Sequence, residues 1–151
     1  MAVTYRKSVA VRSNPGGVFA YLADAQRWPE WAFGIIECLP EPPGQMRNGT
    51  RLVQKARPFG RTTERSAEVV SVSPDSRLVF ASRMGPSPIR FGYDIEPMAQ
   101  GSRLTGWVEV EPRALMRLIA PLLRFVLLRP VIDSELKKIK HAVEAANVGD
   151  A

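Results

Sequence analysis

Few side chains in this sequence are able to carry chemistry, and Tyr93 is the foremost of them. In the segment IRFGYDIEP, Tyr93 alternates with Phe91 and Ile95, which predicts that it lies on the apolar face of a strand. A buried phenol needs a hydrogen-bond partner, and it can polarise a carbonyl group or move a proton. Arg65 and Asp94 are the other candidate catalytic residues. An inward Arg65 would indicate a carboxylate or oxyanion on a ligand, but the alternation around it leaves its direction open.

Other kinds of catalytic and metal site find little support. His141, the only histidine, follows three nearby lysines, so we expect it on the surface. Cys38, the only cysteine, excludes an internal disulfide and a cysteine-based zinc site, and we expect it to be a small buried side chain. The sequence has no histidine cluster, no carboxylates at metal-ligand spacing, no phosphate-binding glycine loop and no nucleophile elbow. It therefore predicts no metal and no cofactor.

Two further polar residues are predicted to point inward. Ser82 alternates with Phe80 and Met84, and Gln54 alternates with Leu52. The simplest interpretation is that backbone groups or a buried water satisfy their hydrogen bonds. The alternative is that they hold the polar end of a mostly apolar ligand, because ligand sites are usually apolar walls with a few placed polar groups.

An antiparallel sheet must position these side chains. Residues 3–12 alternate loosely and predict the first strand, and six more strand-like segments follow between residues 34 and 111, separated by short turns. These segments are IIECL, TRLVQKAR, RTTERSAEVVSVS, RLVFASRM, IRFGYDIEP and SRLTGWVEVEP. Sequential strands joined by short turns indicate a meander of about seven strands with one apolar face.

Two short helices are predicted between the first and second strands. Asn14 followed by Pro15 is a helix-start signal, since Asn accepts hydrogen bonds from free N–H groups and Pro suits the first helical position. Pro29 disfavours the helical conformation at Trp28, so we expect the second short helix to start there.

The most apolar stretch is ALMRLIAPLLRFVLLRPVI, residues 114–132, within a predicted helix over 113–146. Its arginines argue against a bilayer span, and Arg113, Arg117 and Arg124 fall within about 40° of one another on a helical wheel. We expect the wide apolar face to cover the sheet and close a cavity; the alternative is that it lies in the plane of a membrane surface. Pro121 and Pro130 predict a kink or a break.

Composition limits the partners. The formal net charge is +6 and the isoelectric point about 10.0, but the arginines are scattered through every segment. Nucleic-acid binders usually concentrate their charge, so we expect no nucleic-acid partner. The first residues, MAVTYRKSVAVRS, lack the apolar core of a signal peptide, which predicts a cytoplasmic protein.

The sequence resembles the START-like superfamily of polyketide cyclases, dehydrases and lipid-transfer proteins over residues 3–146. The segment NPGGVFAYLADAQRWPEW carries the resemblance through Pro15, Val18, Phe19, Leu22, Asp24, Trp28 and Trp31, together with the strand GSRLTGWVEVEP before the last helix. Ser102 and Gly17 depart from the pattern, where members usually have Thr and a helix-favouring residue. The resemblance implies an α+β helix-grip fold: a curved antiparallel sheet of about seven strands wrapped round a long C-terminal helix, with two short helices after the first strand.

The resemblance also implies one ligand-binding domain over residues 1–151. We expect it to bind or transport a lipid, an isoprenoid or a polyketide-like molecule, as a monomer or homodimer, with transient membrane-surface contact as a further expectation. A cyclase or dehydratase that uses Tyr93 is the alternative, and a protein-interaction domain is a third. Because no convincing catalytic set is present, the sequence favours a binder and leaves catalysis open. The predicted ligand-binding residues are Leu52, Gln54, Leu78, Phe80, Ser82, Met84, Phe91, Tyr93, Ile95, Leu104, Val108, Leu115, Ile119, Leu122 and Val126.

Overall fold

The computed structural model describes residues 2–149 and has the predicted α+β order of elements. Strand β1 (Val3–Val11) is followed by helix α1 (Pro15–Ala23) and the 3₁₀ helix η1 (Ala25–Glu30). The remaining strands are β2 (Ile35–Glu41), β3 (Arg51–Ala56), β4 (Thr63–Ser73), β5 (Arg77–Met84), β6 (Ser87–Met98) and β7 (Gly101–Val110). The chain ends in helix α2 (Met116–Leu123), the π-helical turn η2 (Arg124–Leu128) and helix α3 (Arg129–Gly149).

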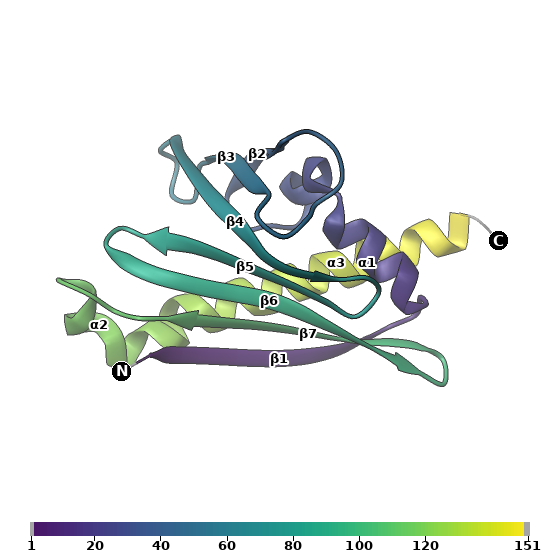
Figure 1. The fold of residues 1–151 in the computed structure, drawn as a ribbon. Helices are drawn as coiled ribbons and strands as arrows, with labels where there is room; N and C mark the ends of the chain where they lie inside the picture. Colours follow the sequence, from purple (N-terminus) through teal and green to yellow (C-terminus); the bar gives the residue numbers. More distant parts are fainter. Residues whose placement is uncertain (1, 150–151) are drawn as a thin grey trace.

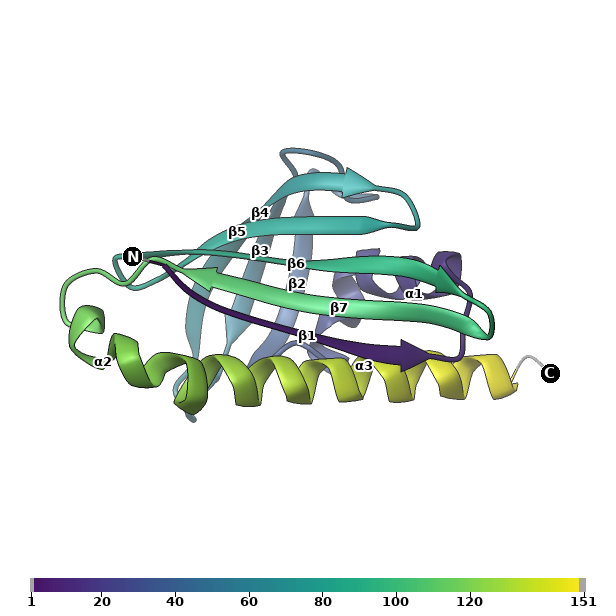
Figure 2. The same cartoon turned by 90° about the horizontal axis from the view of Figure 1, so that it is seen from below.

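All seven strands form one antiparallel sheet in the order β1-β7-β6-β5-β4-β3-β2. From β2 to β7, each strand pairs with its neighbour in sequence. Strand β1 pairs with β7 instead, so β1 and β2 form the two edges of the sheet. The sheet curves strongly, and α3 runs along its concave side (Figures 1 and 2). Register shifts between Ile35 and Glu37 and between Val69 and Ser71 help the strands to bend, because a bulge increases local twist. The predicted helix-grip fold is confirmed.

The two short helices fill the end of the sheet where α3 terminates (Figure 2). Asn14 caps α1 as predicted, since its Oδ1 accepts a 2.7 Å hydrogen bond from the backbone N–H of Gly17. The second short helix does not start at Pro29. It begins at Ala25, with Asp24 accepting from the Gln26 N–H, and a short 3₁₀ turn tolerates the proline near its end.

Helix α3 presents a buried apolar face to the sheet. Ile132, Leu136, Ile139 and Val143 recur at helical spacing and are all buried. The helix comes close to β7 because Gly106 has no side chain, and a Cβ at that position would meet Leu136 Cδ2 at 3.1 Å. This contact fixes the face of α3 that looks into the sheet.

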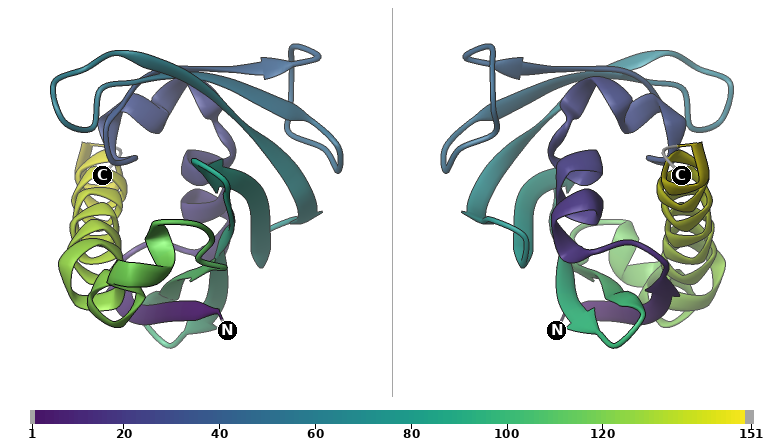
Figure 3. Two further views of the ribbon diagram at one scale, coloured as in Figure 1. Left: turned by 90° about the vertical axis from the view of Figure 1, so that its left-hand side faces the viewer. Right: turned by 90° about the vertical axis from the view of Figure 1, so that its right-hand side faces the viewer.

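Helix α2 has a different course. Figure 3 shows α2 turned aside from the axis of α3, which fulfils the predicted kink. The helix continues through Pro121 and changes direction across η2, where the Arg129 N–H donates to the Arg124 carbonyl five residues earlier. This wider turn directly precedes Pro130, which has no N–H to donate. The helix starts at residue 116 rather than 113, after a left-handed Ala114 with φ 54°.

The prediction that the apolar residues of 114–132 cover the sheet is wrong for most of α2 and η2, where Leu123 and Leu128 are buried but many of their neighbours are not. Six large apolar side chains there are between 49% and 80% exposed: Leu115, Leu118, Ile119, Leu122, Phe125 and Val126. They escape burial because α2 turns aside from α3, whose inward face covers the sheet. Within residues 2–149, no helix is long and apolar enough to cross a membrane.

Candidate ligand-binding site

A cavity of about 300 Å³ lies between the concave face of the sheet and the first turns of α3. Its wall is mostly apolar and aromatic, with contributions from η1, the β3–β4 hairpin and η2. Seven residues singled out from the sequence line it: Gln54, Arg65, Ser82, Met84, Phe91, Tyr93 and Val108. The structure therefore resolves the direction of Arg65, which shares the concave face of β4 with Ala67.

Five predicted ligand-binding residues lie elsewhere in the core. Leu52, Leu78, Phe80, Ile95 and Leu104 are buried but do not line the cavity. Side chains from the short helices occupy the interior at that end of the sheet, and the Trp28 ring packs against Phe80 with centroids 5.0 Å apart. The strand alternation therefore gave the inward direction correctly but not how far the cavity extends along each strand.

The predicted helical contributors to the cavity also need correction. Leu115, Ile119, Leu122 and Val126 are all exposed and do not line it. The cavity instead meets residues from the end of η2 and the start of α3, namely Leu127, Leu128, Val131, Ile132 and Glu135. The helix thus faces the cavity about three turns later in the chain than the sequence suggested, since it returns to the sheet only from the end of η2 onward.

One end of the cavity is polar because Tyr93 and Glu135 meet there. The Tyr93 hydroxyl donates a 3.2 Å hydrogen bond to Glu135 Oε1, and the Phe33 backbone N–H donates to Glu135 Oε2 at 2.8 Å. These contacts join β6, α3 and the segment after η1. The carboxyl group therefore has both oxygens hydrogen-bonded in a mostly apolar wall.

The surroundings of Glu135 change its protonation. Burial raises the pKa of the Glu135 carboxyl to about 7, although hydrogen bonds from Phe33 and Tyr93 and the charges of Lys138 and Arg65 act in the opposite direction. Burial and the neighbouring Glu135 charge raise the pKa of Tyr93 well above its usual value. Glu135 can therefore exchange a proton near neutral pH, whereas Tyr93 stays a hydrogen-bond donor.

Two potential donors complete this polar end. Burial lowers the pKa of Arg65, an effect that the Glu135 charge partly offsets, and this side chain lies on the cavity wall. Trp31 also lines the cavity, packs edge-on against Tyr93 and is 1% exposed. Its indole Nε1 has no hydrogen-bond partner within residues 2–149. A buried N–H group without a partner is costly, so it favours a ligand that brings an acceptor.

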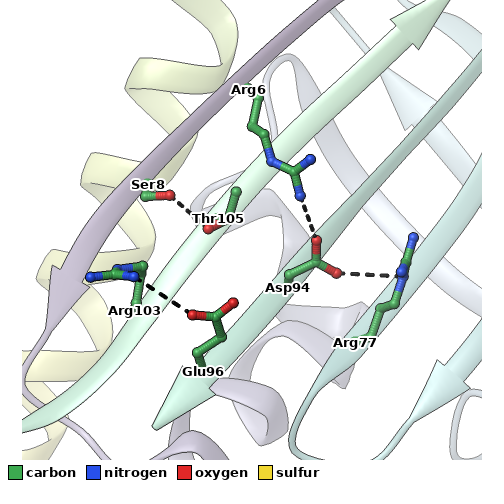
Figure 4. Close-up of polar contacts among 7 residues, drawn as sticks. All are labelled: Arg6, Ser8, Arg77, Asp94, Glu96, Arg103 and Thr105. Carbon is green, nitrogen blue, oxygen red and sulfur yellow. Dashed lines mark hydrogen bonds and ion pairs between the residues drawn. The ribbon is translucent and has the colours of Figure 1, made fainter. Parts of the chain in front are cut away.

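Asp94 does not belong to the site. It follows Tyr93 on β6, and the strand's period of two sends its side chain to the convex face of the sheet. There it pairs with Arg6 at 3.0 Å and Arg77 at 3.4 Å (Figure 4). The same face carries the hydrogen bond between Ser8 and Thr105 at 2.7 Å. Asp94 is therefore part of a surface charge cluster rather than a candidate catalytic residue.

Sequence reasoning missed Glu135, and a signal for it was present. Glu135 lies three residues after Ile132 and four before Ile139, so it shares the apolar stripe of α3. A lone carboxylate within such a stripe indicates a buried ionisable group. The helical residues predicted to line the cavity came instead from the segment 115–126, whose predicted residues are exposed.

The remaining reactive side chains behave as predicted. His141 is exposed on α3, and Cys38 is buried on β2, where burial raises the pKa of its thiol to about 11. The described part of the chain holds no group of three or more His, Cys, Asp or Glu side chains placed to bind a metal ion.

Comparison with known proteins adds to this geometry. A family model described as polyketide cyclase / dehydrase and lipid transport matches residues 2–144. No curated protein matches the sequence.

Solved structures share the fold at low sequence identity. The di-domain ARO/CYC StfQ from the steffimycin biosynthetic pathway aligns over 99% of this chain with 18% identity and a TM-score of 0.79, and this chain covers 53% of it. A START superfamily protein from Mycobacterium smegmatis aligns over 95% of this chain and 98% of its own, with 14% identity and a TM-score of 0.72. Ara h 8.0201 aligns over 96% of this chain and 99% of its own, with 14% identity and a TM-score of 0.71.

Proposed function

The chain belongs to the polyketide cyclase / dehydrase and lipid transport family, and on this premise we propose that its cavity binds a small hydrophobic molecule with one polar end. The observation that carries the proposal is the polar end of the cavity, where Trp31, Tyr93 and Glu135 meet in an otherwise apolar wall. Membership of the family covers lipid carriers and cyclases alike. The residues of this cavity must therefore decide between them.

The size and lining of the cavity define the apolar part of the ligand. Its volume of about 300 Å³ is at the small end of ligand pockets, which run from roughly 300 to 1,000 Å³. Phe91, Ile89 and Val108 supply much of the apolar wall. Burying apolar ligand surface against such a wall contributes about 25 cal/mol per Å². A ligand the size of two fused rings or a medium-length alkyl chain fits these constraints.

The polar residues define the other end of the ligand. Trp31 Nε1 is a donor without a partner in the described structure, and the Arg65 guanidinium supplies further donors. Glu135 is both an acceptor and, when protonated, a donor. Arg65 alone would suit a carboxylate on the ligand, but the charge of Glu135 already acts on Arg65. The polar group of the ligand should therefore be a hydroxyl or a carbonyl that accepts a hydrogen bond from Trp31.

A matched pair of ligands tests this proposal. Isothermal titration calorimetry should show that 2-naphthol binds one site, and that naphthalene, which has the same rings without the hydroxyl, binds at least tenfold more weakly. A hydrogen bond made in a buried site favours the ligand that can form it. Equal affinity for the two compounds would mean that the polar residues of the cavity make no favourable hydrogen bond to the ligand.

A matched pair of variants tests the location. Ala67→Phe fills the cavity from β4, whereas Ser66→Phe adds the same side chain one residue earlier on the opposite face. Ala67→Phe should abolish 2-naphthol binding, and Ser66→Phe should leave it unchanged, with circular dichroism showing that both variants fold. Binding that survives Ala67→Phe would show that the compound binds elsewhere.

Proton transfer at a carbonyl compound is the second candidate function, and the contact between Glu135 and Tyr93 favours it. Glu135 has a pKa of about 7, which suits a general base at neutral pH. The Tyr93 hydroxyl has one proton, so it would turn its hydrogen bond from Glu135 to an enolate oxygen. In such a step the Glu135 carboxylate takes a proton from the carbon beside the carbonyl, and a solvent-derived proton later returns to that carbon.

Hydrogen exchange distinguishes this candidate from simple binding. In D₂O, nuclear magnetic resonance should show loss of the methyl proton signal of 2-acetylnaphthalene if the site transfers protons. Glu135→Gln would then stop the exchange while 2-acetylnaphthalene still binds. Binding without exchange in the wild-type protein would reject the enzymatic candidate and leave the binder.

A further inference from the structure

Helix α2 and turn η2 carry a concentrated apolar surface that neither the cavity nor the core uses. Ten large apolar side chains are exposed within residues 2–149, and six of them lie between Leu115 and Val126. They recur at intervals of three and four residues, so they share one face of the helix. We refer to these six residues, Leu115, Leu118, Ile119, Leu122, Phe125 and Val126, as the α2 patch.

The charges beside the α2 patch have one sign. Residues 112–132 include Arg113, Arg117, Arg124 and Arg129 but no Asp or Glu. Arg113 pairs with Glu111 at 3.5 Å, and Arg129 pairs with Asp133 at 3.8 Å. Both carboxylates lie just outside this segment.

The other two arginines are not neutralised by a carboxylate. Arg117 Nε donates to the Pro112 carbonyl, and the Arg124 guanidinium lies 6.0 Å from the centre of the Phe125 ring. Within the described residues neither Arg117 nor Arg124 forms an ion pair. Two positive charges without a carboxylate partner therefore lie on the same short segment as the exposed apolar surface, and Arg124 contacts Phe125 of the patch.

The α2 patch lies next to the cavity. Ile119, Leu122 and Val126 line a wholly apolar groove of about 310 Å³ whose wall also includes Met84 and Leu127. Met84 and Leu127 line the main cavity as well. The groove and the main cavity are therefore neighbours that share an apolar wall formed by Met84 and Leu127.

We propose that α2 and η2 dock this protein on a membrane surface that contains anionic lipids. The α2 patch would enter the boundary between headgroups and acyl chains, and Arg117 and Arg124 would contact lipid phosphates. A surface helix of this kind binds through buried apolar area together with attraction to anionic lipids. This inference does not depend on which ligand the cavity binds.

A membrane explains the composition of this surface better than a second copy of the chain. An interface between two α2 patches would bring two sets of uncompensated arginines together, and like charges across an interface are unfavourable. Anionic lipid supplies the complementary charge beside an apolar layer, which is the arrangement that the α2 patch and its arginines present.

Vesicle co-sedimentation tests the proposal with the full-length protein. The protein should pellet with vesicles of phosphatidylcholine mixed with phosphatidylglycerol, and only weakly with phosphatidylcholine alone. Added salt should weaken the binding, because it screens the charge contribution.

Two double variants separate the apolar and electrostatic parts. Leu118→Ser with Phe125→Ser should lower vesicle affinity at least tenfold, since it removes two exposed apolar side chains. Arg117→Gln with Arg124→Gln should lower it about 30-fold at low salt, from the loss of two juxtamembrane charges. The matched control is Leu39→Ser with Arg103→Gln, which changes an exposed Leu on β2 and an exposed Arg on β7 and should have no effect.

Two results would overturn the proposal. One is the absence of binding to the anionic vesicles, or equal loss of binding in the control variant. The other is a dimer in analytical ultracentrifugation that Phe125→Ser dissociates, combined with no vesicle binding, which would make a second copy the partner of the α2 patch.

Discussion

Helices α2 and α3 belong to one continuous helical segment, yet α3 buries its apolar face whereas α2 leaves most of its apolar side chains exposed. Leu136 on α3 is 1% exposed, whereas Leu122 on α2 is 60% exposed. The difference runs against composition, because α3 carries most of the charged residues of the segment and α2 is the more apolar. Burial is therefore decided by where the sheet offers a surface to cover, and η2 directs the chain away from that surface.

This contrast separates two roles within the helix. Helix α3 holds the fold together through its buried face and places Glu135 in the cavity. Helix α2 contributes Leu123 to the core but keeps most of its large apolar side chains exposed. Changes in α3 should therefore alter stability and the site, while changes in α2 should alter mainly surface behaviour.

The largest effect should follow from Leu136→Ala. Leu136 is buried against Gly106, so shortening it removes apolar contacts and leaves a cavity, which costs about 2 to 5 kcal/mol of unfolding free energy. Urea denaturation monitored by circular dichroism measures the change. A loss below about 1 kcal/mol would mean that α3 does not provide the central packing.

Glu135→Gln should change the pH dependence of stability. The pKa of Glu135 is raised from 4.5 to about 7 in the folded protein, so its contribution is fully present below 4.5 and lost as pH rises through 7. Relative to the variant, wild-type unfolding free energy should fall by roughly 2 to 3 kcal/mol across this window.

Glu144 on the same helix supplies the control for that measurement. Hydrogen bonds from Lys140 and the Arg12 N–H lower the pKa of Glu144. Its contribution is present above the ordinary carboxyl pKa and is lost as pH falls. Denaturation of Glu144→Gln, with the pH series extended below 4.5, should therefore show the opposite trend at its acidic end, and parallel trends for the two variants would contradict the burial of Glu135.

Asp94→Asn extends the comparison to the two faces of the sheet. Asp94 pairs with Arg6 and Arg77 on the convex face, where ion pairs are partly exposed, so the loss should be at most about 1 kcal/mol. Calorimetric titration should find 2-naphthol affinity unchanged, because Asp94 does not line the cavity. A large drop in affinity would restore Asp94 as a functional residue.

Leu122→Ala should have the smallest effect. Its side chain lies on the exposed α2 patch, so unfolding free energy should change by less than about 0.5 kcal/mol. The same urea denaturation used for Leu136→Ala provides the comparison. Equal destabilisation by the two substitutions would show that α2 packs on the core in solution.

The sheet and the short helices could be predicted from the sequence because their signals are local. Alternation placed Phe91 and Tyr93 on the concave face, and Asn14 marked the start of α1. The inward direction of a strand residue depends only on its own period of two. Residues of the helix were harder to place, since a wide apolar face fits either a core or a surface.

The pairing of Tyr93 with Glu135 depends on contacts 42 residues apart in the sequence. Alternation predicted that Tyr93 would be buried and need a partner, but nothing local identified which residue provides it. The sequence could not predict the exposure of Leu115 and Leu122 either. This exposure follows from the change of direction at η2 rather than from the hydrophobicity of α2.

The most direct test of the proposed site observes the indole N–H groups during ligand addition. In two-dimensional ¹H–¹⁵N spectra, with Trp31→Phe used for assignment, the Trp31 indole signal should shift and saturate as 2-naphthol is added. Trp107 is the internal control, because its buried Nε1 also lacks a partner in the described structure but its ring lies beneath Arg77 on the convex face. A saturating shift of Trp31 alone is the predicted result. An unchanged Trp31 signal, or equal shifts of Trp31 and Trp107, would contradict a polar-ended ligand site in this cavity.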